Sequence, residues 1–184
     1  MWAIIIIVAI IVIAILLFIG SYNGLVRLRN RVDNAWAQID VQLKRRHDLI
    51  PNLVETVKGY AAHERETLDS VVQARNQAVS ANGPQQQGQA EGVLSQALGR
   101  LFALAEAYPN LKANENFLQL QEELTATEDK VAYARQFYND SVTSYNIKIA
   151  SIPANIIAGM FNFTKRELFE IETPEDRDVP KVQF

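Results

Sequence analysis

The sequence has no cysteine among its 184 residues. This absence excludes disulfides, thiolate zinc sites, cysteine nucleophiles and a lipid-bearing cysteine. It is compatible with either side of a membrane, so it does not assign a compartment.

Histidine is scarce, and neither of the two histidines has the neighbour that a metal site needs. A ferritin-like centre in a helical bundle uses Glu-x-x-His pairs, which place a carboxylate and an imidazole one turn apart. Lys44 and Tyr60 stand three residues before His47 and His63. We therefore expect no metal and no cofactor, and we interpret His63, beside Glu64 and Glu66, as part of a solvated patch.

Signatures of catalysis and of nucleic-acid binding are also missing. No serine or threonine lies in a glycine-framed elbow, and the glycines form no phosphate-binding loop. The formal net charge is −3, whereas a protein that neutralises phosphates needs a basic excess. These absences predict a chain that is not an enzyme and binds neither nucleic acid nor a small-molecule substrate.

What the sequence does have is a long apolar run at its N-terminus. From Trp2 to Gly20 there is no charge and no polar side chain other than the first indole. Such a run, at about 1.5 Å rise per residue, matches a hydrocarbon layer roughly 30 Å thick. Trp2 and Tyr22 stand at its two ends, where amphipathic rings favour the headgroup level. We predict a transmembrane anchor over residues 1–21.

A cleaved signal peptide is the competing interpretation of this run. It would carry a basic segment before the run and a small-residue cleavage site after it, and the sequence has neither. Three arginines follow the run, Arg27, Arg29 and Arg31, and none precedes it. The positive-inside rule then places the rest of the chain in the cytoplasm.

The segment after the anchor has the apolar spacing of long amphipathic helices. Leu25, Val32 and Ile39 form one seven-residue row, and a neighbouring row runs from Trp36 to Val57. Pro51 predicts a kink or a restart. We expect the helix to continue to about Ala78, with Gly59 only a mild weakness.

Later segments predict a loop, two more helices and a tail. Residues 82–92 are rich in glycine and glutamine and indicate an exposed flexible loop. A short helix with a wide apolar face follows and stops before Tyr108-Pro109-Asn110. A long helix then runs from an Asn114 cap to about Ala150. Residues 152–163 are apolar but too short to span, and predict a short helix or loop on the bundle or at the membrane surface.

Together these elements predict an all-α fold, an N-terminal transmembrane helix followed by an antiparallel up-and-down bundle with long, coiled-coil-like helices. The expected domains are the anchor at 1–21, the bundle at 22–166 with its flexible loop at 82–92, and an acidic, proline-containing C-terminal tail at 167–184, extended and partly disordered.

Several strings occur together and in order along the chain. They are Asn34-Ala35-Trp36-Ala37-Gln38-Ile39-Asp40, Arg45-Arg46-His47-Asp48-Leu49-Ile50-Pro51-Asn52, Ala134-Arg135-Gln136-Phe137-Tyr138-Asn139 and Pro153-Ala154-Asn155. After an N-terminal anchor, they make the chain resemble the LemA family over nearly its whole length. The resemblance implies one transmembrane segment and an antiparallel bundle, and no catalytic residue or substrate. One departure is Asn162, where a glycine is common.

The resemblance and the charge pattern nominate two sets of candidate residues. Polar residues of the family motifs are Asn34, Gln38, Asp48, Asn52, Arg135, Asn139 and Asn155. A membrane-proximal basic patch would comprise Arg27, Arg29, Arg31, Lys44, Arg45 and Arg46, attracted to an anionic leaflet. Alternatively, Asp48 and Asn52 pair with Arg45 and Arg46 or cap the restart at Pro51, and the charges are ordinary solvated faces.

The sequence therefore favours a membrane-anchored helical scaffold that self-associates at the bacterial cytoplasmic membrane and binds or shapes the bilayer. The expected partners are the lipid bilayer and further copies of the chain. The alternative is an accessory subunit that docks another membrane protein, either an enzyme or a transporter.

Overall fold

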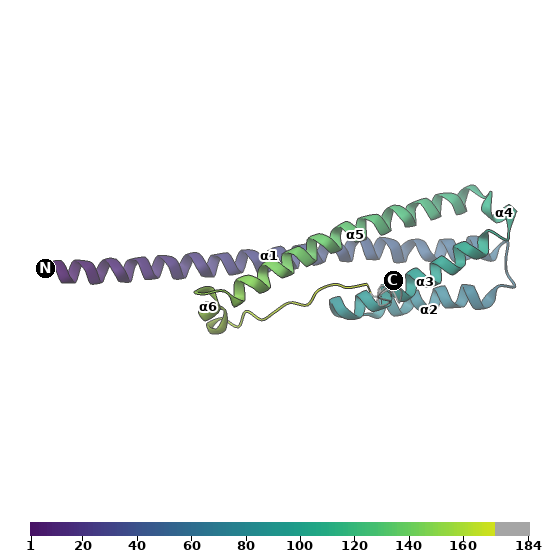
Figure 1. Ribbon diagram of the computed structural model, residues 1–184. Helices are drawn as coiled ribbons and strands as arrows, with labels where there is room; N and C mark the ends of the chain where they lie inside the picture. Colours follow the sequence, from purple (N-terminus) through teal and green to yellow (C-terminus); the bar gives the residue numbers. More distant parts are fainter. Residues whose placement is uncertain (172–184) are drawn as a thin grey trace, which may run out of the picture. The chain divides into compact units, whose positions relative to one another are not determined.

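The protein is described by a computed structural model in which residues 1–171 are placed. The predicted tail from residue 172 onward lies outside the described residues. Six helices and no strand occur in residues 1–171 (Figure 1), so the all-α prediction is confirmed. The helices are α1 (Trp2–Lys58), α2 (Arg65–Ser80), α3 (Gly83–Ala105), α4 (Pro109–Lys112), α5 (Glu115–Ala150) and α6 (Ala154–Met160).

The chain divides into two compact units, and the two longest helices contribute to both. The first unit comprises residues 1–37 and 136–167, and the second comprises residues 38–135 and the chain from 168. Each unit therefore contains part of α1 and part of α5.

In the first unit the start of α1 packs against the end of α5 and against α6. The Trp36 and Tyr138 rings lie 5.4 Å apart, and the Arg31 guanidinium lies over the Phe137 ring at 5.0 Å. Leu25 and Val32 are buried as the apolar row predicts. The part of α1 that precedes this packing holds the one apolar stretch in the described residues that is long enough to cross a membrane.

The second unit is a four-helix bundle made by the end of α1, by α2 and α3, and by the start of α5. Its core contains Leu53 and Val57 of α1, Val71 of α2, Leu101 of α3 and Phe117 of α5. Burial of these apolar side chains supplies the driving force for packing.

Of the two predicted alternatives at Pro51, a restart does not occur, because helix α1 continues through this residue. Proline has no N–H, so the carbonyl oxygen four residues earlier, on His47, loses its helical donor. Arg75 of α2 replaces it, because its Nε donates to this oxygen at 3.2 Å. A contact from another helix thus satisfies the position that the sequence alone marks as weak.

The chain does break where the sequence predicted continuity, between Lys58 and Arg65. The expected single helix to Ala78 is wrong. The reason is packing: Leu68, Val71 and Ala78 of α2 are buried in the same core as Leu53 and Val57 of α1. The chain must reverse direction for these two faces to meet, and a straight helix would leave both without a partner.

Residues 82–92 differ from the expected exposed loop, because all but the first belong to α3. Gly83 has a φ of 81°, which glycine adopts without steric cost, and proline is tolerated in the first helical turn at Pro84. Gln87, Gly88 and Glu91 are buried. The composition that resembles a loop therefore encodes a helix that buries two of its polar side chains, Gln87 and Glu91.

The remaining boundaries agree with the sequence. Asn114 caps α5, because its Oδ1 accepts a hydrogen bond of 3.0 Å from the Phe117 N–H. Helix α5 ends at Ala150, and α6 is the short helix expected within residues 152–163. Asn162 has a φ of 54°, a left-handed conformation that asparagine tolerates.

The described start of the predicted tail lies on the second unit. Phe169 is fully buried. The backbone of Glu170 runs so close to α3 that a Cβ placed on Gly88 would overlap the Glu170 carbonyl oxygen. A glycine at position 88 is therefore what allows this segment to approach the helix.

We expect Gly88→Ala to lower the melting temperature of the protein and Gly99→Ala, its matched control, to raise it. Both glycines lie in α3, where alanine is intrinsically preferred by about 1 kcal/mol. At Gly99 a new Cβ meets nothing, whereas at Gly88 it meets the Glu170 backbone. Thermal unfolding followed by circular dichroism in mild detergent measures both shifts. An increase of similar size in both variants would show that the segment does not pack on α3.

Candidate functional site

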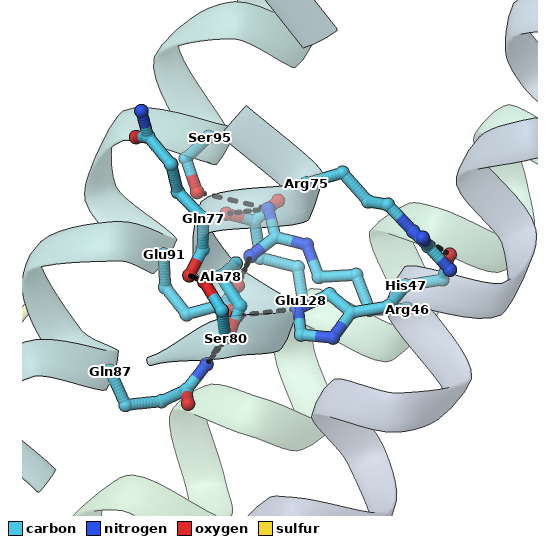
Figure 2. Close-up of polar contacts among 10 residues, drawn as sticks. All are labelled: Arg46, His47, Arg75, Gln77, Ala78, Ser80, Gln87, Glu91, Ser95 and Glu128. Carbon is cyan, nitrogen blue, oxygen red and sulfur yellow. Dashed lines mark hydrogen bonds and ion pairs between the residues drawn. The ribbon is translucent and has the colours of Figure 1, made fainter. Parts of the chain in front are cut away.

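The strongest concentration of polar chemistry in the described residues is a buried network around one carboxylate, that of Glu91. This side chain on α3 is 0% exposed. Its Oε2 accepts a hydrogen bond of 3.0 Å from Arg46 Nη1, and its Oε1 lies 2.7 Å from His47 Nε2 (Figure 2). Gln87 Nε2 also donates to Oε1, at 3.1 Å.

Arg46 connects the carboxylate to two further side chains. It is 2% exposed, and its Nη2 donates to Ser95 Oγ at 2.9 Å. The same nitrogen lies 3.7 Å from a carboxylate oxygen of Glu128 on α5. Its Nε has no hydrogen-bond partner in the described structure. One guanidinium therefore joins α1 to both α3 and α5.

Helix periodicity explains why these groups meet. Gln87 and Glu91 are four residues apart, so they share one face of α3. Gln87 extends the network to α2, because its Nε2 also donates to the Ala78 carbonyl oxygen at 3.0 Å. The end of α1, helices α2 and α3, and the start of α5 thus each contribute a group (Figure 2).

The arrangement balances charge in a place where an unpaired charge is costly. An arginine and a histidine face one buried glutamate, and each carboxylate oxygen accepts from at least one donor. Because the Glu91 carboxylate is paired on both oxygens, the groups resemble a structural network more than a reactive centre.

Beside the network lies a cleft of about 290 Å³. Its polar lining includes Lys44, His47, Asp48, Arg75 and Gln87. In residues 1–171 no group of three or more histidine, aspartate or glutamate side chains could hold a metal ion.

Arg46 was wrongly assigned to the predicted basic patch, because its side chain is buried against Glu91. Arg45 stays exposed, although its Nη2 lies 3.8 Å from Glu123. The patch was predicted from charge alone, and charge does not reveal which side of a helix faces a partner. Arg27, Arg29 and Arg31 are exposed in the first unit and remain candidates for a membrane surface.

The expected pairing of Asp48 and Asn52 with Arg45 and Arg46 was wrong, because glutamates of α3 and α5 take those arginines. The other family-motif residues are not brought together. Asn34, Gln38, Asp48, Asn52 and Asn155 are exposed, and Arg135 and Asn139 are half-buried.

Three α3 residues of the network were not predicted from the sequence: Gln87, Glu91 and Ser95, which hydrogen-bond with Arg46 or with one another. The first two lie in the segment that was interpreted as a loop. Their spacing at i and i+4, followed by Ser95 after four more residues, is the signal that could have placed all three on one face of a helix.

His63, interpreted as a solvated patch, is exposed and contacts an aromatic residue of the α3–α4 connection. Tyr108 Oη lies 2.8 Å from His63 Nε2 and donates to Glu64 Oε1 at 2.9 Å. The hydrogen bond to Glu64 raises the pKa of Tyr108 above its ordinary value of 10.0, with smaller contributions from burial and from the Glu64 charge.

The predicted anchor ends are in different settings. Trp2 is exposed at the start of α1. Tyr22 packs against two rings that follow α6, with centroids 4.8 Å from Phe161 and 6.0 Å from Phe163.

Comparison with known families settles the relationship of the chain. The sequence model of the LemA family matches residues 35–184. The chain belongs to the LemA family. The matched range contains every member of the Glu91 network, which makes the network part of the region that defines membership.

Three curated relatives support this assignment. The chain is 28% identical to "Protein LemA" of Metamycoplasma hominis, over 88% of this chain and 74% of that protein. It is 26% identical to "Magnetosome protein MamQ 2" of Paramagnetospirillum magneticum, over 94% of this chain and 75% of that protein. It is also 26% identical to "Magnetosome protein MamQ" of Magnetospirillum gryphiswaldense, over 89% of this chain and 70% of that protein. Family, fold and the apolar run together describe a membrane-associated helical protein.

In this LemA family chain we expect Glu91→Ala to lower the free energy of unfolding by roughly 3–5 kcal/mol, because it leaves Arg46 buried without its partner. The double variant Arg46→Met with Glu91→Leu should recover much of that loss, since it removes both charges. Urea unfolding of the full chain in mild detergent measures each value.

The matched control is Glu106→Ala, which removes an exposed ion pair with Lys112 and should cost under about 1 kcal/mol. If Glu91→Ala cost no more than this control, the network would not stabilise the bundle.

A second prediction concerns Tyr108. Glu64→Ala should lower the pH at which one tyrosine ionises, because it removes the contact that raises the Tyr108 pKa. Since the folded pKa lies above the unfolded one, this contact stabilises the fold at neutral pH and is lost as pH rises through the folded pKa. Alkaline titration of tyrosinate absorbance measures the shift, with Glu66→Ala as control. Identical curves for both variants would contradict the assignment.

Proposed function

We propose that this LemA family protein is a membrane-anchored helical scaffold that self-associates at the bacterial cytoplasmic membrane. The observation that carries the proposal is that α1 continues without a break from an exposed apolar run into a bundle whose buried Glu91 is paired with Arg46 and His47. Such a chain has an anchor and interaction surfaces, and its buried polar network serves packing.

Attachment rests on the run from Trp2 to Gly20. The apolar window of this helix is 0% buried by the rest of the chain. Leaving so many isoleucine and leucine side chains in water costs about 25 cal/mol per Å² of apolar surface. A bilayer removes that cost and a helix satisfies its own backbone there.

Orientation rests on Arg27, Arg29 and Arg31, which are exposed and follow the run directly. By the positive-inside rule these residues stay in the cytoplasm, together with the bundle. The same arginines would draw the first unit toward anionic lipid headgroups, at about 1 kcal/mol each. Any binding or shaping of the bilayer would then depend on these three residues and not on Arg46, which is buried.

Self-association rests on apolar side chains that the bundle leaves exposed. In the second unit these are Val41 of α1, Val72 and Val79 of α2, Val93 of α3, and Leu118 and Tyr133 of α5. Weak contacts through such side chains become significant when anchors confine the copies to a plane, because confinement raises their effective concentration. The absence of a named reaction among the relatives is compatible with a scaffold.

The same exposed side chains would also suit the alternative, an accessory subunit of a membrane enzyme or transporter. The two functions differ in what occupies the surface, further copies of the chain or one different protein. The size of the purified protein distinguishes them.

We expect the full chain in mild detergent to form a large discrete assembly, and the same chain beginning at Ser21 to be much smaller at equal concentration. Multi-angle light scattering with detergent correction measures both masses. A concentration series of the shorter chain is the control, because assembly driven by weak contacts should reappear as its concentration rises. Monomers of both chains at every concentration would overturn the scaffold proposal, and a single co-purifying protein would support the accessory subunit.

A further inference from the structure

Helix α6 packs one face inside the first unit, while the helix and the residues beside it expose several large apolar side chains. Ala154, Ile157 and Ala158 are buried. Ile152 is 83% exposed, Ile156 63%, Met160 65% and Phe161 46%. Four large apolar side chains on so short a segment form an exposed apolar surface, which we call the α6 face.

The position of this face in the first unit identifies what covers it. The Phe161 ring lies 6.2 Å from the ring of Phe18, which belongs to the apolar run of the anchor. It also lies 4.8 Å from the ring of Tyr22, just beyond the run. The α6 face is therefore continuous with the end of the anchor, at the depth where the anchor leaves the hydrocarbon.

The charges around α6 fit the same place. No charged residue occurs between Lys148 and Lys165. The guanidinium of Arg29 lies over the Phe163 ring at 5.2 Å. An uncharged segment with apolar side chains outward and cationic groups at its margins is typical of a helix that lies in the interface of an anionic bilayer.

Asn162 helps to hold this arrangement. Its left-handed conformation turns the chain directly after Phe161. As a result Phe161 and Phe163 both contact Tyr22. The return of the chain from α6 is thus fixed against α1 by aromatic contacts on both sides of the turn.

We infer that α6 is a second membrane-contacting element, whose face of Ile152, Ile156, Met160 and Phe161 inserts into the leaflet at which the anchor emerges. This inference rests on the anchor part of the proposed function. It adds that the protein contacts the bilayer through two elements, the apolar run of α1 that spans it and the shallow interfacial helix α6. The occupant of the face is lipid and not a second copy of the chain.

Single labels test the inference directly, because the natural chain has no cysteine. The variants Ile156→Cys and Met160→Cys replace exposed side chains and should not disturb the fold. Asn34→Cys, exposed on α1 beyond the run, is the aqueous control, and Ile11→Cys, within the run, is the hydrocarbon control. Each full-length variant carries an NBD fluorophore in vesicles of phosphatidylcholine and phosphatidylglycerol.

Nitroxides on the lipid acyl chains, placed near the headgroup or near the bilayer centre, then report depth. An interfacial helix lies about 5–10 Å into the headgroup and acyl boundary. Labels at positions 156 and 160 should therefore be blue-shifted and lose most emission to the shallow nitroxide. Ile11→Cys should lose more to the deep nitroxide, and Asn34→Cys should be quenched by neither.

The outcomes separate the two proposals. If position 11 were quenched while positions 156 and 160 behaved as position 34, the inference on α6 would be overturned and the anchor would stand. If position 11 also escaped quenching, both would fail. If positions 156 and 160 were blue-shifted but unquenched, and the shift declined as protein was diluted in lipid, a second copy would cover the face instead.

Discussion

The packing of the bundle depends on one buried carboxylate, that of Glu91, which interacts with Arg46, His47 and Gln87 at once. Removing Glu91 from water costs several kcal/mol unless both oxygens and the opposing charge are satisfied in place. Arg46, His47 and Gln87 meet that requirement only when α1 and α3 stand at one rotation and one height relative to each other. Apolar burial alone would tolerate a slip of one turn between helices, since the leucine, isoleucine and valine side chains of the core are similar in size. The network makes such a slip unfavourable, because the slip would leave the buried Arg46 without its partner Glu91.

Sequence patterns predicted the parts of the fold that depend on local chemistry. The seven-residue rows identified buried positions such as Leu25 and Ile50, and the side chain of Asn114 marked the start of α5. The apolar stretch long enough to cross a membrane followed from composition alone. In each case the deciding residues are close together in the sequence.

The predictions that failed involve partners distant in the sequence. At Pro51 the sequence left a kink and a restart open, because it does not show that Arg75 of α2 donates to the free carbonyl oxygen of His47. Glutamines and glycines near residue 88 do not form a loop because Glu91 and Gln87 meet Arg46 and Ala78 inside the bundle. Arg46 itself was assigned to a lipid-facing patch, since nothing within a few residues of it announces a glutamate 45 positions away. The sequence therefore shows the regular spacing of Gln87, Glu91 and Ser95, but it does not show that this face of α3 pairs with Arg46.

The aromatic contacts at the end of the anchor also have a geometric consequence. The apolar run and the start of the bundle belong to one helix with no linker between them, and Phe161 packs on both Phe18 and Tyr22. Each residue of an α-helix turns about 100°. The chain therefore has a fixed azimuth: α6 always lies on the same side of the transmembrane axis. In the arrangement that we propose, the first unit would therefore meet the leaflet asymmetrically, and neighbouring lipids or proteins would encounter a different surface according to the direction of approach.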